Sequence, residues 1–164
     1  MTTRTNTQIS PGPQQTSAVA DPVDVRGPRF AAWITTAVLL AVLVASAFST
    51  GAAAVLLAAQ AIVFALGALF GPRRHPYGLI FSRLVAPRLG PVTEREPVAP
   101  LRFAQLVGLV FALAGLAGFA VGAPLAGVIA AAFALAAAFL NAAFGICLGC
   151  QIYPLVHRVR RTHI

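Results

Sequence analysis

The sequence predicts an all-α, polytopic membrane protein with four transmembrane helices arranged as two hairpins. Hydrophobic residues make up 59% of its 164 residues and only 10% are charged, whereas about a quarter of the residues of a soluble domain are charged. Four segments of about 20 residues lack Asp, Glu, Lys, Arg and His, which is the length needed to cross a hydrocarbon core of ~30 Å. Because lipid offers the backbone no hydrogen-bond partner, these segments must be helical.

We expect the four spans at residues 30–50, 52–70, 103–121 and 125–146, within a membrane domain that covers residues 23–157. Residues 1–22 form a polar tail that lacks the apolar content needed to repay ordering, so we expect it to be disordered. Residues 158–164 form a basic tail. The first apolar segment begins later, and is longer, than the apolar region of a cleavable signal, so we expect it to remain as the first span.

The distribution of arginine predicts the topology. All twelve basic residues are arginine: three precede the first span, six lie in the loop at residues 71–102, and three follow the fourth span. By the positive-inside rule, both termini and this loop are cytoplasmic, as expected for a multi-pass protein of the bacterial inner (plasma) membrane. The arginines flank spans and form no patch interleaved with aromatic residues, so we expect the lipid bilayer, and no nucleic acid, as the partner of this charge of +8.

The two hairpins resemble each other in sequence. Arg29-Phe30 opens the first as Arg102-Phe103 opens the second, at an offset of 73 residues, and Phe70-Gly71 ends the first as Phe144-Gly145 ends the second, at an offset of 74. A duplication would give parallel repeats about an axis along the membrane normal. Chance matches also arise easily between segments rich in Ala and Leu, so both interpretations stay open.

Small residues suggest close helix packing. Gly67 with Gly71, and Gly118 with Gly122, have the spacing that lets membrane helices approach closely, which also leaves a homodimer open. The loop segment 77–85 combines apolar residues with arginine, as is typical of a short helix on the cytoplasmic membrane surface.

Cys147 and Cys150, the only cysteines, form a C-x-x-C pair at the end of the fourth span. On a continuing helix both would project from one face, close enough to form a disulfide after local adjustment. We take them as the candidate catalytic residues, without ordering them; the alternative is that both are small buried packing residues. At a helix C-terminus the dipole would disfavour a thiolate. A closed zinc site needs four ligands, so we expect no metal and no cofactor.

Candidate binding residues lie in the first half and deeper in the fourth span. If the repeat is real, Arg73, Arg74 and His75 would face the two thiols and stabilise a thiolate or bind an anionic sulfur species. Asn141, nearly two turns before Cys147, would line a pocket that leads to the thiols. The alternative for Asn141, as for Gln60 in the second span, is a hydrogen bond between helices.

Three motifs, in order, carry a family resemblance: Val25-Arg26-Gly27-Pro28-Arg29-Phe30, Arg73-Arg74-His75-Pro76-Tyr77, and the segment at residues 141–153 that contains the cysteines. Over about residues 22–160 the chain resembles a bacterial, mainly actinobacterial, integral membrane family called domain of unknown function 4395. Its members are reported near genes for thioredoxin-like proteins and sulfurtransferases. The resemblance implies that Cys147 and Cys150 matter and that thiol or sulfane-sulfur metabolism is involved, without giving a reaction.

Three hypotheses follow for function. In the first, the C-x-x-C pair exchanges with a thiol, disulfide or persulfide, one cysteine attacking and the other resolving the mixed disulfide. In the second, the protein is a non-catalytic membrane docking partner for a thioredoxin-like or sulfurtransferase protein. In the third, it is a small transporter for a sulfur anion. The sequence leaves open whether the protein is an enzyme. The spans contain no carboxylate, which argues against an ordinary proton- or cation-coupled transporter.

Overall fold

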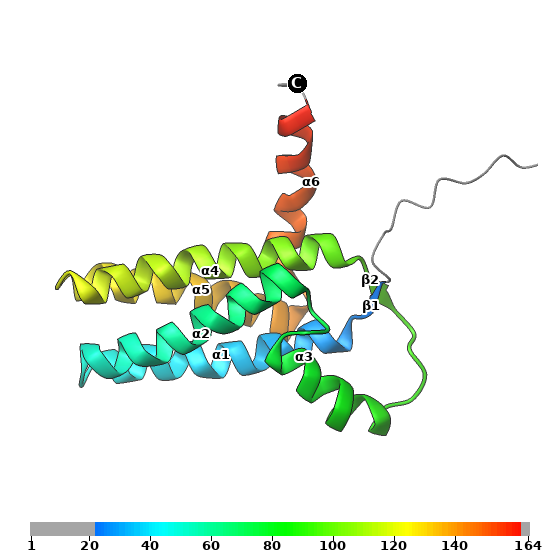
Figure 1. Cartoon of the computed structure of the whole chain (residues 1–164), viewed down its shortest axis with the longest axis horizontal. Helices are drawn as coiled ribbons and strands as arrows, with labels where there is room; N and C mark the ends of the chain where they lie inside the picture. The colour runs from blue at the N-terminus through cyan, green and yellow to red at the C-terminus, as the bar shows by residue number, and fades with distance from the viewer. Residues whose placement is uncertain (1–21, 162–164) are drawn as a thin grey trace, which may run out of the picture.

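The computed structural model describes residues 22–161 and contains four long helices that run side by side (Figure 1). They are α1 Arg26–Ser46, α2 Thr50–Phe70, α4 Val98–Ala120 and α5 Pro124–Phe144. All four are long and apolar enough to cross a membrane. The predicted all-α fold with two helical hairpins is confirmed. All four helices begin before the predicted spans. The difference is largest for α1 and α4, because their helical backbone continues past the apolar boundary into residues that include arginine.

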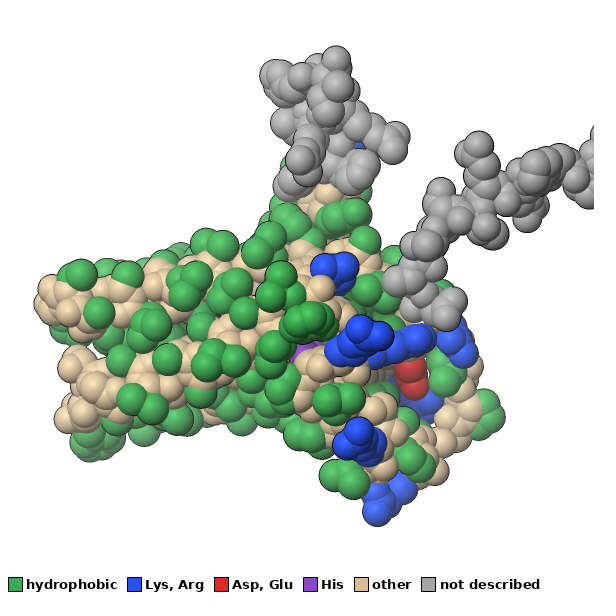
Figure 2. Space-filling model, in the orientation of Figure 1, with side chains coloured by type: hydrophobic (Ala, Val, Ile, Leu, Met, Phe, Trp, Pro, Cys, Tyr) green, Lys and Arg blue, Asp and Glu red, His purple; other side chains and the backbone are tan. Residues whose placement is uncertain are grey.

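Each long helix packs against two others, in the ring order α1, α2, α4, α5. The core between them is narrow and includes Leu39, Val42, Leu57 and Phe64. Most other large apolar side chains point outward, and they cover the long sides of the bundle (Figure 2). A water-soluble bundle would place polar residues on these faces, so this surface is consistent with a multi-pass membrane protein.

The two members of each predicted glycine pair have different roles. Gly118 faces Gly127 so closely that a Cβ atom at Gly118 would lie 2.6 Å from the Gly127 nitrogen, and this glycine contact lets α4 and α5 approach. Gly71 and Gly122 instead have φ angles of 84° and 76°, which favour glycine. They follow the ends of α2 and α4. One member of each predicted pair therefore terminates a helix rather than packing two helices together.

The two hairpins make reciprocal contacts. Arg29 Nη2 in α1 lies 3.4 Å from the Ala142 carbonyl of α5, and Arg102 Nε in α4 lies 2.8 Å from the Ala68 carbonyl of α2. The last carbonyls of a helix have no partner within the helix, and the negative end of its dipole attracts a cation. The offsets, 73 between the arginines and 74 between the carbonyls, equal those of the sequence repeat. Such an exchange is what a duplication predicts.

The remaining elements gather near one end of the bundle (Figure 1). The two-residue strands β1 Val23–Asp24 and β2 Arg95–Glu96 pair antiparallel, which ties the start of α1 to the segment that leads into α4. A short helix α3 Pro76–Ile80 continues as a π-helical turn η1 Phe81–Val85 and a 3-10 turn η2 Ala86–Arg88. The predicted helix at residues 77–85 is thus helical, although irregular.

The last helix, α6 Leu148–Arg161, runs at a steep angle to the four long helices and packs against α4 (Figure 1). The predicted basic tail therefore does not begin at a break in structure: residues 158–161 are the last turn of α6. The predicted disordered tail lies, except for Pro22, outside the described residues, as do residues 162–164.

Replacing Gly118 with alanine should destabilise the bundle by about 1–3 kcal/mol, because the new methyl group would collide with the α5 backbone. Unfolding of the purified protein in mixed detergent micelles, followed by circular dichroism, measures this change. Gly90→Ala is the matched control, since a Cβ atom there would meet nothing within 4 Å. Equal stability of the two variants would contradict the close approach of α4 and α5.

Candidate functional site

The fourth span ends before the cysteines. The last residue of α5 is Phe144, and Gly145 follows in the left-handed conformation with φ 69°. The Gly145 N–H donates to the Asn141 carbonyl at 3.0 Å, which closes the helix as a left-handed glycine cap commonly does. A new helix, α6, begins at Leu148. The two cysteines therefore do not lie on a continuation of the fourth span, the case in which both would project from one helix face.

Cys147 is the N-cap residue of α6. Its carbonyl accepts the first helical hydrogen bond, from the Gln151 N–H at 3.1 Å, and its Sγ accepts a hydrogen bond from the Cys150 N–H at 3.3 Å. The two cysteines form a disulfide, with their Cα atoms 5.2 Å apart. The predicted electrostatic effect thus reverses sign: Cys147 lies at the positive end of a helix dipole, where a thiolate is favoured.

The residues between and after the cysteines attach α6 to α4. A Cβ atom at Gly149 would lie 2.6 Å from the Ala104 Cα atom, so only glycine permits this crossing without a shift. One turn later, the Tyr153 ring lies against Phe103 with ring centroids 5.8 Å apart. Both cysteines are half-buried, whereas Leu148 between them is exposed. The contacts with α4 therefore hold the disulfide in place, and both cysteines remain partly exposed.

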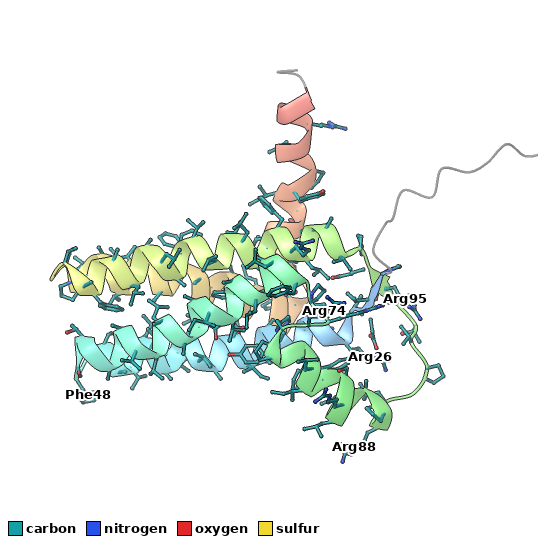
Figure 3. The ribbon with its side chains drawn as sticks, in the orientation of Figure 1. Arg26, Phe48, Arg74, Arg88 and Arg95 are labelled. Carbon is teal, nitrogen blue, oxygen red and sulfur yellow. A yellow bond between two sulfur atoms is a disulfide. The ribbon has the colours of Figure 1, made fainter. Side chains whose placement is uncertain are left out.

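The contacts that are described for the other predicted site residues do not involve the cysteines. Arg73 donates to the Pro22 carbonyl at 3.1 Å, and Arg74 is exposed on the side of the bundle end where Arg26 and Arg95 lie (Figure 3). His75 is buried and its ring packs edge-on against a tyrosine. Asn141 is half-buried, and its backbone carbonyl accepts the Gly145 cap described above. A role for these four residues beside the thiols stays a prediction.

A buried polar cluster connects the loop to the interior of the bundle. The Tyr77 hydroxyl donates to Gln60 Oε1 at 2.8 Å, and its ring lies 5.9 Å from the His75 ring. Gln60 is 1% exposed and His75 is 2% exposed. Gln60 therefore does bond across elements, but to α3 rather than to a neighbouring span. The sequence did not predict this contact of Tyr77 with Gln60; the signal was the His75-Pro76-Tyr77 segment placed a few residues after an apolar span.

The cluster is only partly satisfied. Within the described chain, Gln60 Nε2 and His75 Nδ1 are buried without a hydrogen-bond partner. Burial lowers the pKa of His75 below its ordinary value, because a buried imidazolium would lose its hydration. His75 is accordingly neutral at neutral pH, which weakens its predicted role as a cation beside the thiols.

Acidification should destabilise the protein through His75. Because the folded-state pKa is depressed, the unfolded chain binds the proton more readily, so stability is lost as the pH falls below about 6.5, by up to about 1.4 kcal/mol per pH unit. The free energy of unfolding of wild type and His75→Gln, measured from about pH 7.5 to about pH 5.5, checks this.

Subtracting the free energy of unfolding of His75→Gln from that of wild type at each pH removes the contribution of the other titrating groups. The most relevant is Glu96, whose pKa is raised by burial and by Glu94 and which acts in the opposite direction. A wild-type curve parallel to that of His75→Gln would mean that the imidazole is hydrated in the folded protein.

Comparison with known proteins gives a family and nothing finer. No curated protein and no solved structure matches the chain. One protein-family model does match, over residues 23–158, which includes all four spans, the buried polar cluster and both cysteines. The chain therefore belongs to the family described as domain of unknown function DUF4395.

Proposed function

We propose that Cys147 and Cys150 carry out thiol–disulfide or sulfane-sulfur exchange at the cytoplasmic face of a bacterial inner membrane. The observation that carries this proposal is the position of Cys147 as N-cap of α6, with its Sγ bonded to the Cys150 N–H. A sulfur atom held at a helix N-terminus is favoured as a thiolate, which is the nucleophilic form. This geometry also supports an order for the pair: Cys147 attacks and Cys150 resolves.

The exchange balances without a cofactor. In the dithiol protein, the Cys147 thiolate attacks a partner disulfide, forms a mixed disulfide and releases one partner thiolate. The Cys150 thiolate then attacks the Cys147 sulfur, releases the second partner thiolate and closes the disulfide within the chain. With a persulfide partner, Cys147 takes the outer sulfur and releases a thiol, and attack by Cys150 then releases hydrogen sulfide.

The charge distribution supports a cytoplasmic location for this chemistry. Arginines from β2, from the loop after α2 and from the start of α1 lie near the end of the bundle where α6 begins (Figures 2 and 3). If this end is cytoplasmic, as the positive-inside rule predicts, both termini are cytoplasmic as well. The cytosol would keep the pair reduced at rest, ready to react with an oxidised partner such as a thioredoxin-like protein or a sulfurtransferase.

A second candidate is docking of such a partner without exchange. It is favoured by the exposed face of the α3–η1 segment, where Leu79, Ile80 and Leu84 are 38%, 41% and 56% exposed. Arg83 and Arg88 lie beside this apolar face and are exposed. An apolar surface bordered by charge is typical of a protein contact.

The order of attack gives a trapping experiment. Reduced Cys150→Ser should accumulate a mixed disulfide with glutathione disulfide, and Cys147→Ser should react at least about tenfold more slowly because its remaining thiol is not an N-cap. Intact-protein mass spectrometry at neutral pH measures both rates, and the double serine variant is the blank. Equal rates, or faster reaction of Cys147→Ser, would contradict the proposed order.

The same variants separate exchange from docking and test the side of the membrane. In intact cells, a membrane-permeant maleimide should label the wild-type thiols and an impermeant one should not, with the label lost reversibly after an oxidising challenge. Thiols that stay inert to the permeant reagent would overturn the exchange proposal. Capture of an oxidised thioredoxin-like protein that persists in the double serine variant would favour docking.

A further inference from the structure

We infer that α6 is a membrane-surface helix that binds the anionic headgroup layer of the bilayer at the arginine-rich end of the bundle. The inference goes beyond the proposed function and does not depend on the cysteines being reactive. It rests on the direction of α6, on the level at which α6 crosses α4, and on the distribution of side chains around α6.

The direction of α6 excludes a fifth span. The four long helices run alongside one another, and α6 leaves them at a steep angle (Figure 1). If the long helices cross the bilayer, α6 runs along the membrane plane. Its length of 14 residues, or about 21 Å, is also too short for a span.

The crossing point sets the depth of α6. Gly149 in the first turn of α6 contacts Ala104 of α4. In α4, the arginine nearest the apolar run is Arg102, and the apolar run begins at Phe103. The helix therefore crosses α4 at the boundary between the charged start and the apolar body. About 9 Å of α4, the six residues from Val98 to the crossing, extends beyond it. A helix at this boundary lies at the level of the lipid headgroups.

The described side chains of α6 divide into faces that match this position. Leu148, Ile152 and Leu155 have the spacing i, i+4 and i+7 of one helical stripe and are 38%, 47% and 65% exposed. The large apolar residues on this stripe thus remain uncovered by the described chain. Gln151 and Arg158, seven residues apart, share a neighbouring stripe and are also exposed. Such a helix lies in the membrane interface with its apolar stripe toward the acyl chains.

The arginines of α6 favour binding to anionic lipids. The described turns of α6 contain Arg158 and no acidic residue, and its sequence continues with Arg160 and Arg161. Each arginine near an anionic membrane surface adds to the electrostatic attraction. Anionic glycerophospholipids therefore fit this helix better than neutral ones. The disulfide at its start is then held at the membrane surface, so an exchange partner has to approach along that surface.

The test measures the environment of single positions in the full chain. In the Cys147→Ser, Cys150→Ser background, where serine still serves as an N-cap, one cysteine is introduced at residue 151, 152 or 155 and labelled with a nitrobenzoxadiazole fluorophore. Ile62→Cys, at an outward-facing position of α2, is the lipid control, and Gly90→Cys, in the open loop, is the water control. The variants are reconstituted into vesicles of phosphatidylcholine with or without phosphatidylglycerol.

Two quenchers then distinguish the occupants of the apolar stripe. Labels at 152 and 155 should be quenched by nitroxide-labelled lipid, and quenched by aqueous iodide at least about threefold less than the label at 151. Strong iodide quenching at 152 and 155, as at Gly90→Cys, would place the stripe in water and overturn the inference. Protection from both quenchers would mean that protein, such as a second copy, covers the stripe, and would overturn it equally.

Comparing vesicles with and without phosphatidylglycerol tests whether α6 prefers anionic lipid. Omitting phosphatidylglycerol should increase iodide quenching at 152 and 155, and adding Arg158→Gln in anionic vesicles should change it in the same direction. Identical quenching in neutral and anionic vesicles would show that apolar contact alone seats the helix and would overturn the preference for anionic lipid. Monodisperse elution of each labelled variant before reconstitution separates these outcomes from misfolding.

Discussion

The carbonyl groups at the ends of α2 and α5 impose the constraint on which the arginine-rich end of the bundle depends. At these points the chain leaves the apolar span, and the last carbonyls of each helix need donors that the helix itself cannot supply. Arg102 supplies them for α2 and Arg29 supplies them for α5. Each donor comes from the other hairpin, so terminating the spans also joins the two halves of the molecule.

The segments that follow the ends of α2 and α5 have different structures in the two halves. In the first half, the segment after Gly71 turns inward, buries His75 and sends Tyr77 to Gln60 within the bundle. In the second half, the segment after Gly145 turns outward and leads to α6, which begins at Leu148 with Cys147 as its N-cap. A repeated structural position thus carries a buried polar contact in one half and a disulfide at the surface in the other. The contrast follows from what comes next: the α3–η1 segment packs on α1 through Phe81 of η1 and Phe30, whereas α6 packs on α4 through Gly149.

Hydropathy and arginine spacing could predict the four spans and the hairpin arrangement, because lipid leaves a long apolar segment no alternative to a helix. They could not predict the break before the cysteines. The apolar run continues through Ile146, and the spans contain other glycines, such as Gly118, that do not interrupt a helix. The difference lies in tertiary contacts: Gly118 is pressed against α5, whereas a Cβ atom at Gly145 would meet nothing within 4 Å. For the same reason, sequence could not show that His75 is buried.

The break at Gly145 matters because it starts a new helix in which the residues that form the disulfide differ from the residues that attach the helix to the bundle. Closing or opening the disulfide makes or breaks the bond between Cys147 and Cys150. Attachment of α6 depends instead on Gly149 against Ala104 and on Tyr153 against Phe103. The hydrogen bond from the Cys150 N–H to the Cys147 sulfur uses a backbone donor that both redox states retain. A change of redox state therefore does not require α6 to leave α4, and the cysteines can react while the helix that carries them stays in place.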